Sequence, residues 1–308
     1  MTTQATENGL LLPGLDGTNP LGFLAALGVL RILTLRGHSP KMRWTQSGGV
    51  WRPAISGLPS QLPSLETELH DALASLDHSA WSISKKLPFE ANIFRNHVKD
   101  GVWKASVRDR QLVDLLASFG AEFFEDDGGA FEETELCMVR SGDAAGQGMI
   151  AYGRRIIETS EPNHIKKAIE ANWLNSDDKC ALRLDPGEDK PYGLQWQNPS
   201  SVGAMSEKGA NCLALLALPC FPVIPTHREA KTVGFGLRQP KQSSFTWPIW
   251  DCSLNLNVVC SILALDELQR PMPERSRLNS MGIAAVYRCD RVMTSKYYAN
   301  FTPARQLC

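Results

Sequence analysis

The sequence lacks the short motifs by which most catalytic and metal-binding sites are recognised. It contains no GxSxG nucleophile turn, no P-loop GxxxxGK(S/T) and no HExxH, and its six histidines are scattered along the 308 residues. None of the eight cysteines forms a CxxC pair, and no Cys or His cluster has zinc-ligand spacing. We therefore expect no active site, no metal and no cofactor, and hence a protein that is not an enzyme.

Cysteine is absent before Cys137, and no stretch is apolar for long enough to cross a membrane. Cys212, Cys220 and Cys260 fall in apolar runs, where a free thiol behaves as a small core residue, so we expect reduced thiols and a reducing compartment. The amino terminus, MTTQATENG, resembles no signal peptide. The longest apolar run, residues 21–35, is interrupted by Arg31 and is too short for a bilayer. These absences predict a cytoplasmic protein without a membrane segment.

Net charge is nearly absent, but the charge is unevenly distributed. The formal total of −1 argues against a protein that coats nucleic acid by bulk charge. Residues 1–150 carry 13 Lys/Arg and 18 Asp/Glu, whereas residues 151–308 carry 19 and 15. Residues 270–308 hold seven basic side chains against Glu274 and Asp290. A local basic face is one interpretation of this excess, and an ordinary solvated surface is the other.

What the sequence does contain is one well-marked helix near its beginning. Asn19 and Pro20 predict an N-cap followed by proline at the first helical position, and Gly37 predicts the stop. The residues between them are apolar on nearly every face, which is typical of a core helix. Gly22 and Gly28 would weaken this helix unless another backbone packs closely against it.

The rest of the chain mixes short strands and helices without a regular βαβ repeat, which predicts an α+β fold with mixed or antiparallel sheets and packed helices. A hairpin is expected from residues 41–45 and 50–55, with Pro53 placing the second strand on a sheet edge. Further helices are predicted at 64–77, 106–119, 162–174, 206–218 and 254–268, and one more after residue 148. An exposed loop is predicted at 122–135. Strands are predicted at 134–140, 181–184, 193–197, 231–237, 245–250 and 283–292. The chain would form one large or two intimately packed domains, with a division into 1–140, which holds the hairpin and the buried first helix, and 141–308, which holds the basic end.

Basic and aromatic residues alternate in three places, and this pattern indicates contact with nucleic acid, because cations position phosphates and rings stack on unpaired bases. The candidate phosphate-binding residues are Arg43 and Arg52 on the hairpin, Arg228, Lys231, Arg238 and Lys241 in the second patch, and Arg288, Arg291 and Lys296 near the end. Gln239 and Asn300 are candidates for reading base edges. The alternative is ordinary strand alternation, with one set of side chains in the core and the other in solvent.

Residues 141–148, SGDAAGQG, form a glycine-rich segment between a predicted strand and a predicted helix, where backbone N–H groups can hold an anion. The segment lacks the Lys-Ser/Thr pair of a P-loop and the glycine spacing of the dinucleotide fingerprint. Gly142, Gly146 and Gly148, together with Asn19 before the first helix, are therefore candidates for a loop that touches a sugar-phosphate backbone. A plain tight connection is the alternative.

The stretch at residues 12–33, LPGLDGTNPLGFLAALGVLRIL, resembles the N-terminal signature of CRISPR-associated proteins of type I-G (formerly I-U) systems, in which an Asn-Pro or similar pair precedes a helix of the form FxAxxGxLRxL. Three further stretches are similar to that family: LRLDPGEDKPY at 182–192, GANCLA at 209–214 running to Phe221-Pro222, and TVGF at 232–235 leading to FTWPIW at 245–250.

The resemblance implies a large-subunit-like component of Cascade, the RNA-guided complex that surveys DNA in antiviral defence. Such subunits lie near the handle of the guide RNA, read the short protospacer-adjacent motif (PAM) and help to recruit the helicase-nuclease. Most are not nucleases, in agreement with the missing active site. The expected partners are then guide RNA, target double-stranded DNA, other Cascade subunits and the helicase-nuclease. Two alternatives stay open: an adaptor that binds only proteins, and a nucleotide-processing enzyme that uses residues 141–148.

Overall fold

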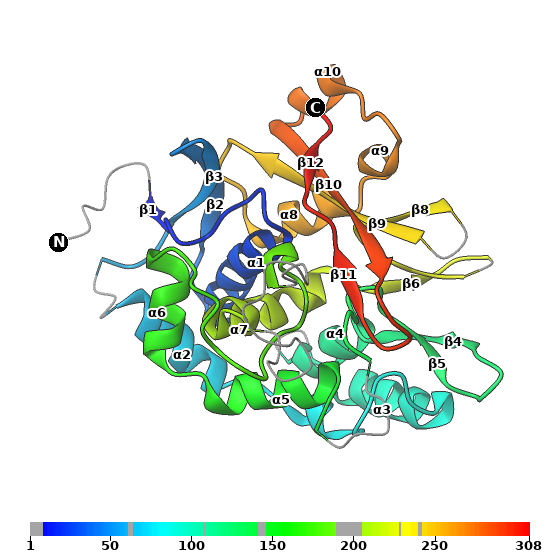
Figure 1. The fold of residues 1–308 in the computed structure, drawn as a ribbon. Helices are drawn as coiled ribbons and strands as arrows, with labels where there is room; N and C mark the ends of the chain where they lie inside the picture. Colours follow the sequence, from blue (N-terminus) through cyan, green and yellow to red (C-terminus); the bar gives the residue numbers. More distant parts are fainter. Residues whose placement is uncertain are drawn as a thin grey trace, which may run out of the picture.

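Helix α1 (Pro20–Leu35) is buried from Pro20 to Leu33 in the computed structural model, and other elements surround it (Figure 1). The side chain of Asn19 caps the helix, because its Oδ1 accepts hydrogen bonds from the backbone N–H groups of Leu21 at 2.9 Å and Gly22 at 3.4 Å. Gly37 follows the helix with φ of +84°, a left-handed conformation that glycine adopts without strain. The predicted core helix and both of its ends are confirmed.

The structure describes residues 9–60, 64–106, 109–140, 146–188, 205–227, 229–239 and 242–308. The further helices are α2 (Leu65–Ala74), α3 (Ala91–Lys104), α4 (Gln111–Ala117), α5 (Met149–Thr159), α6 (Pro162–Glu170), α7 (Lys208–Ala217), α8 (Leu256–Leu263), α9 (Asp266–Gln269) and α10 (Arg275–Asn279). The strands are β1 (Leu10–Leu11), β2 (Lys41–Ser47), β3 (Val50–Ser56), β4 (Gly120–Glu125), β5 (Phe131–Glu133), β6 (Val223–Pro225), β7 (Ala230–Thr232), β8 (Phe235–Gln239), β9 (Gln242–Trp250), β10 (Ile283–Met293), β11 (Ala299–Phe301) and β12 (Arg305–Gln306).

The strands form small antiparallel sheets, and helices pack against them, so the predicted α+β fold is confirmed. One sheet has the order β1-β3-β2, and the largest has the order β11-β10-β9-β8, with β12 also paired to β10. Two hairpins, β4-β5 and β6-β7, complete the described sheets. None of the helices in the described ranges has both the length and the hydrophobicity of a bilayer span.

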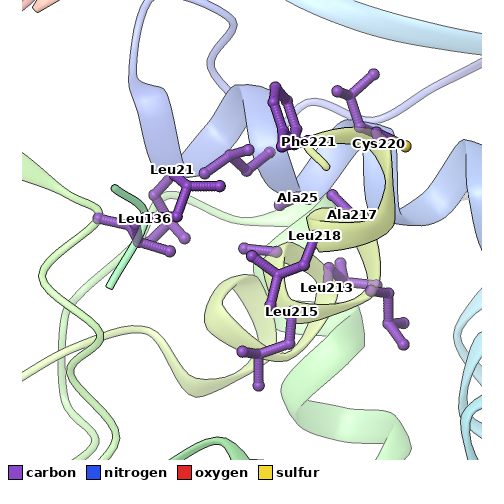
Figure 2. Packing of buried hydrophobic residues seen from close by; sticks show 14 of the residues in the cluster. Leu21, Ala25, Leu136, Leu213, Leu215, Ala217, Leu218, Cys220 and Phe221 are labelled. Atoms are coloured by element: carbon purple, nitrogen blue, oxygen red, sulfur yellow. The ribbon is translucent and has the colours of Figure 1, made fainter. Parts of the chain in front are cut away.

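Helices α1 and α7 approach each other so closely that a side chain at one position would not fit. A Cβ atom on Gly28 would overlap the carbonyl oxygen of Leu213, and a Cβ atom on Gly22 would overlap that of Asp16. Figure 2 shows side chains of both helices in this contact, among them Ala25 of α1 and Ala217 of α7. The prediction that these two glycines mark close backbone contacts is confirmed.

Aromatic side chains join the β1-β3-β2 sheet to α1 and to β9. Trp44 of β2 stacks on Phe23 of α1, with 5.8 Å between ring centroids. The indole N–H of Trp250 in β9 donates to the carbonyl of Met42 at 2.8 Å. The main hydrophobic core built on these contacts extends from Leu12 to Phe301 and takes residues from both sides of position 140.

The prediction that Pro53 lies on a sheet edge is wrong, because β3 is the middle strand. Strand β1 is only two residues long and pairs with Ile55 and Ala54, so it does not require an N–H group at Pro53. The carbonyl of Pro53 is still used, since it accepts a hydrogen bond from the backbone N–H of Leu12 at 2.9 Å. A short neighbour therefore allows proline inside this sheet.

Residues 122–135 were expected to form a loop, but most of them belong to the β4-β5 hairpin. Phe131 explains the difference, because it is buried and stacks on Phe94 of α3 with 4.0 Å between ring centroids. Helix α3 itself has no counterpart among the predicted elements, and the helix predicted at 106–119 is limited to α4, Gln111–Ala117.

Two predicted strands are absent from the described structure. Residues 134–140 are mostly buried but make single contacts instead of a ladder, such as the bond from the N–H of Ala299 to the carbonyl of Met138 at 2.8 Å. Residues 181–184 are interrupted at Arg183, which has φ of +58°, outside the strand region. The strand predicted at 193–197 lies outside the described residues.

Candidate nucleic-acid interface

Asn19, a candidate for backbone contact, uses both ends of its amide inside the protein. Its Oδ1 caps α1, and its Nδ2 donates a hydrogen bond to Oδ1 of Asp185 at 2.8 Å. The same carboxylate oxygen accepts from the backbone N–H of Gly187 at 2.8 Å. Asn19 therefore connects the start of the first helix to the turn at residues 183–188.

This turn contains a buried carboxyl group, that of Glu188. Its Oε2 accepts from the backbone N–H of Arg183 at 2.9 Å, and its Oε1 accepts from the amide of Asn211 at 3.2 Å. Burial raises the pKa of Glu188 to about 8, because removal from water disfavours the charged form. Near neutral pH this group binds a proton more readily than an exposed glutamate does, and its contacts are all to the protein's own residues.

Asn300, a candidate for base reading, is also buried. Its Oδ1 accepts a hydrogen bond from the guanidinium of Arg183 at 2.8 Å, and that guanidinium lies 4.5 Å from the ring centroid of Tyr298. The side chain therefore holds the strand at the end of the chain to the 183–188 turn. In this conformation the amide of Asn300 is not presented to the groove of a nucleic acid.

Arg288 is buried and donates all of its described hydrogen bonds within the protein. Its Nε donates to Oγ1 of Thr246 at 2.7 Å, and its Nη2 donates to the carbonyls of Leu268 and Arg270 at 2.7 and 2.8 Å. These carbonyls lie at the carboxyl end of α9, where a helix leaves its last C=O groups without intrahelical partners. Arg288 therefore caps a helix end and does not face a phosphate.

Arg291 is half-buried. Its Nη2 donates to the carbonyl of Cys137 at 3.2 Å, and burial lowers its pKa. Lys296, in the turn after β10, is exposed and lies 5.7 Å from the ring centroid of Tyr297. Of the three cations predicted near the end of the chain, Arg288 is buried, Arg291 is half-buried and Lys296 is exposed.

The patch at 228–241 is only partly described. Lys231 is half-buried in β7, opposite Ile224. Arg238 and Gln239 are the last residues of β8, but their side chains, like Arg228 and Lys241 as a whole, lie outside the described residues. Of the four cations of this patch, only Lys231 has a described side chain.

The glycine-rich segment is described from residue 146 onward, and Gly142 lies outside the described residues. Gly146 and Gly148 have positive φ angles of +77° and +93°, so both positions require the freedom of glycine. The N–H of Met149, the first residue of α5, already donates to the carbonyl of Val139 at 2.9 Å. These features fit a tight connection into α5.

The β2-β3 hairpin presents its cations on one outward face. Met42 and Trp44 are buried, so Lys41, Arg43 and the alternate residues of β2 face away from the core. Arg52 of β3 is paired with Thr45, and Arg43 is paired with Ala54, so the two arginines are diagonal neighbours on the same face. We call Lys41, Arg43 and Arg52 the hairpin cations. Lys41 is exposed and both arginines are half-buried.

The sequence around this surface lacks acidic residues. Residues 37–65 contain no Asp or Glu, although Asp and Glu make up 33 of the 308 residues. The segment of chain that carries the hairpin cations therefore contains no acidic residue. In the described ranges, no three His, Cys, Asp or Glu side chains come together in a way that could hold a metal ion.

No protein-family model matches the sequence, and no curated protein matches it either. The resemblance to type I-G CRISPR-associated proteins therefore stays a prediction. What the chain does is inferred from its own residues.

Proposed function

We propose that this chain is a non-catalytic, nucleic-acid-binding subunit of a type I CRISPR surveillance complex, and that it contacts the phosphate backbone through the hairpin cations. The observation that carries the proposal is the outward face of β2 and β3, where Lys41, Arg43 and Arg52 lie within a segment free of acidic residues. Cations of this kind fix the position of a protein on nucleic acid without reading base sequence. Binding of the guide-RNA handle, PAM recognition and recruitment of the helicase-nuclease belong to the same proposal.

In the described residues, each of the other three stretches that resemble the CRISPR-associated family contacts the first stretch. Asn19 contacts Asp185, Gly28 packs on Leu213, and the indole N–H of Trp247 donates to the carbonyl of Gly17 at 2.8 Å. Arg31, from the same signature, donates to the carbonyl of Leu216 in the last turn of α7 at 3.1 Å. These contacts support a scaffold role for the signature, with the binding face elsewhere.

The test compares two triple variants of equal charge. The first replaces the hairpin cations (Lys41→Gln, Arg43→Gln, Arg52→Gln), and the second replaces exposed cations on other elements (Lys167→Gln, Lys179→Gln, Arg275→Gln). With fluorescently labelled duplex DNA at about 0.15 M salt, we expect the first to bind roughly 10- to 100-fold more weakly, because three phosphate contacts are lost. Equal weakening by both triple variants would contradict the proposal.

Assembly is tested by co-expression with the products of neighbouring genes, followed by purification with and without nuclease. A nucleic-acid-binding subunit is expected to lose contacts when the RNA and DNA are digested. A complex that survives digestion unchanged, together with unchanged duplex binding by the first triple variant, would favour the adaptor alternative.

A further inference from the structure

Helix α3 carries a tryptophan that is almost entirely exposed. Trp103 has 91% of its surface in contact with solvent, and among the residues of α3 only Ala91, Phe94 and Gly101 are buried. An aromatic side chain of this size normally contributes 150–250 Å² of buried area to a core or an interface. Trp103 contributes almost none to this fold, so its ring is available to a ligand.

Trp103 lies in a stripe of exposed side chains that suit a nucleotide. Asn96, Lys99 and Trp103 are spaced by three and four residues, which places them on one face of the helix, and all three are exposed. An amide can hydrogen-bond a base edge, an ammonium group can neutralise a phosphate, and an indole can stack on a base. The stripe therefore combines three kinds of nucleotide contact within two turns.

The charge around α3 favours a polyanion over an apolar protein segment. Residues 85–110 contain seven Lys/Arg and three Asp/Glu, although residues 1–150 as a whole contain 13 and 18. Arg95 is paired with Glu125 at 2.9 Å and Arg110 with Asp114 at 3.4 Å. Within the described residues, Lys99 and Lys104 have no carboxylate within the 4.0 Å of an ion pair, so both charges are available to a phosphate.

The carboxyl end of α3 indicates how a nucleic-acid strand would lie along the helix. Trp103 is in the last turn of α3, where the carboxyl end of a helix carries partial negative charge and disfavours phosphate. Lys99 is one turn earlier, about 6 Å along the axis at 1.5 Å per residue. A base is therefore expected over Trp103, with its phosphate toward Lys99. An open hollow of about 350 Å³ lies at the same end of α3 and is lined by Val102, Ala105, Ser106, Arg110 and Val113.

We propose that the exposed face of α3 binds an unpaired nucleotide of single-stranded nucleic acid, with its base stacked on Trp103 and its phosphate at Lys99. This inference rests on the proposed function and adds a second contact to it. Figure 1 shows α3 and the β2-β3 hairpin on opposite sides of the molecule, so the two contacts are separate. A base within a duplex is already stacked on both faces, so this contact selects single strands.

The test uses the full chain with labelled oligothymidylate and, in parallel, labelled duplex DNA. Trp103→Ala is expected to weaken oligothymidylate binding about 5- to 150-fold, the loss typical of one stacked base, and to leave duplex binding unchanged. Trp103→Phe should retain most of the single-strand affinity, because a ring is still present. Met272→Ala, which removes another exposed apolar side chain (87% exposed), is the matched control and should change neither. Because Trp103 is so exposed, its variants should unfold at the wild-type temperature.

Two results would overturn the inference. In the first, Trp103→Ala binds oligothymidylate as the wild type does, while the hairpin triple variant still loses duplex DNA; the proposed function then stands and α3 is not part of it. In the second, single-strand binding is unaffected but Trp103→Ala releases a protein from the nuclease-treated complex, and α3 is then a protein interface. If the hairpin triple variant binds duplex DNA as the wild type does, and Trp103→Ala binds oligothymidylate as the wild type does, the proposed function itself is contradicted.

Discussion

Strand β10 and the β2-β3 hairpin both alternate basic and aromatic residues, yet the fold uses their cations in opposite ways. In β10, Arg288 donates to Thr246 and to the last carbonyls of α9, and Arg291 donates to the carbonyl of Cys137. In the hairpin, Arg43 and Arg52 share an outward face with the exposed Lys41. The same sequence pattern therefore produces structural cations in one region and a candidate binding face in the other.

The difference follows from whether another element covers the sheet face that carries the cations. Strand β10 pairs with β9 on one side and with β11 and β12 on the other, and the end of α9 lies against the side chain of Arg288. In the described residues, the hairpin packs on α1 and β9 through the face of Met42 and Trp44, and the two arginines of its other face are half-buried. Alternation along a strand indicates which side chains share a face, but it does not indicate whether that face is later covered.

The largest expected effect separates the two regions by stability. Arg288→Ala should lower the free energy of unfolding by about 3 kcal/mol, because it leaves the buried carbonyl of Leu268, the part-buried carbonyl of Arg270 and the Thr246 hydroxyl without their donor. Arg52→Ala should change it by only about 0.5 kcal/mol, as for most surface substitutions. Urea unfolding curves of the two variants check this comparison. Similar midpoints for both would mean that β10 and the hairpin do not differ in the way described.

The buried carboxyl group of Glu188 is expected to make the free energy of unfolding depend on pH. Burial raises the pKa of Glu188 to about 8, compared with 4.5 for an ordinary glutamate. The folded state therefore binds the proton more tightly, so the contribution of this group to stability is greatest below about pH 4.5 and decreases as the pH rises to about 8. Glu188→Gln keeps the shape of the side chain and an acceptor for the Arg183 N–H. Because glutamine does not titrate, the free energy of unfolding of this variant should decrease by a few kcal/mol less than that of the wild type as the pH rises.

Unfolding free energies measured between about pH 5 and pH 8 test this expectation, with Glu158→Gln at an exposed position as the matched control. The wild type and the control should lose stability in parallel across this range, and the Glu188→Gln curve should be flatter. A Glu188→Gln curve parallel to that of the wild type would show that this carboxyl is not held in its protonated form.

The sequence predicts elements that depend on local chemistry better than it predicts tertiary cover. Asn19, Pro20 and Gly37 define α1 because capping acts within a few residues. Helix α3 has no such signal, since it buries only one large side chain, Phe94, and therefore shows weak apolar periodicity. The apolar run at 134–140 suggests a strand, but its backbone groups bond to separate elements instead of one neighbour.

The candidate site was predictable in part for the same reason. Arg43 and Arg52 could be identified because the Gly48-Gly49 turn fixes the hairpin register, and register decides which residues share a face. The internal role of Arg288 depends on the end of α9, and that of Asn300 depends on Arg183, 117 residues earlier in the chain. Such distant partners leave no mark in a local pattern.

A smaller effect is expected at Lys296, which belongs to the β10 region but is exposed. Lys296→Gln should leave the free energy of unfolding unchanged. It should remove at most one phosphate contact, so the slope of log K against log salt for duplex binding should become shallower by no more than about 0.9. Fluorescence anisotropy at several salt concentrations measures this slope. A change as large as that of the hairpin triple variant would move the binding face from the hairpin to the β10 region.

The most direct test of the account is the salt dependence of duplex DNA binding by the wild type and by the variant that lacks Lys41, Arg43 and Arg52. Each phosphate neutralised by the protein contributes a slope of about −0.9, so loss of the hairpin cations should make the slope shallower by between about 2 and 3, whereas the control triple variant should follow the wild type. Parallel lines for the wild type and the hairpin variant would contradict the claim that this face binds the nucleic-acid backbone.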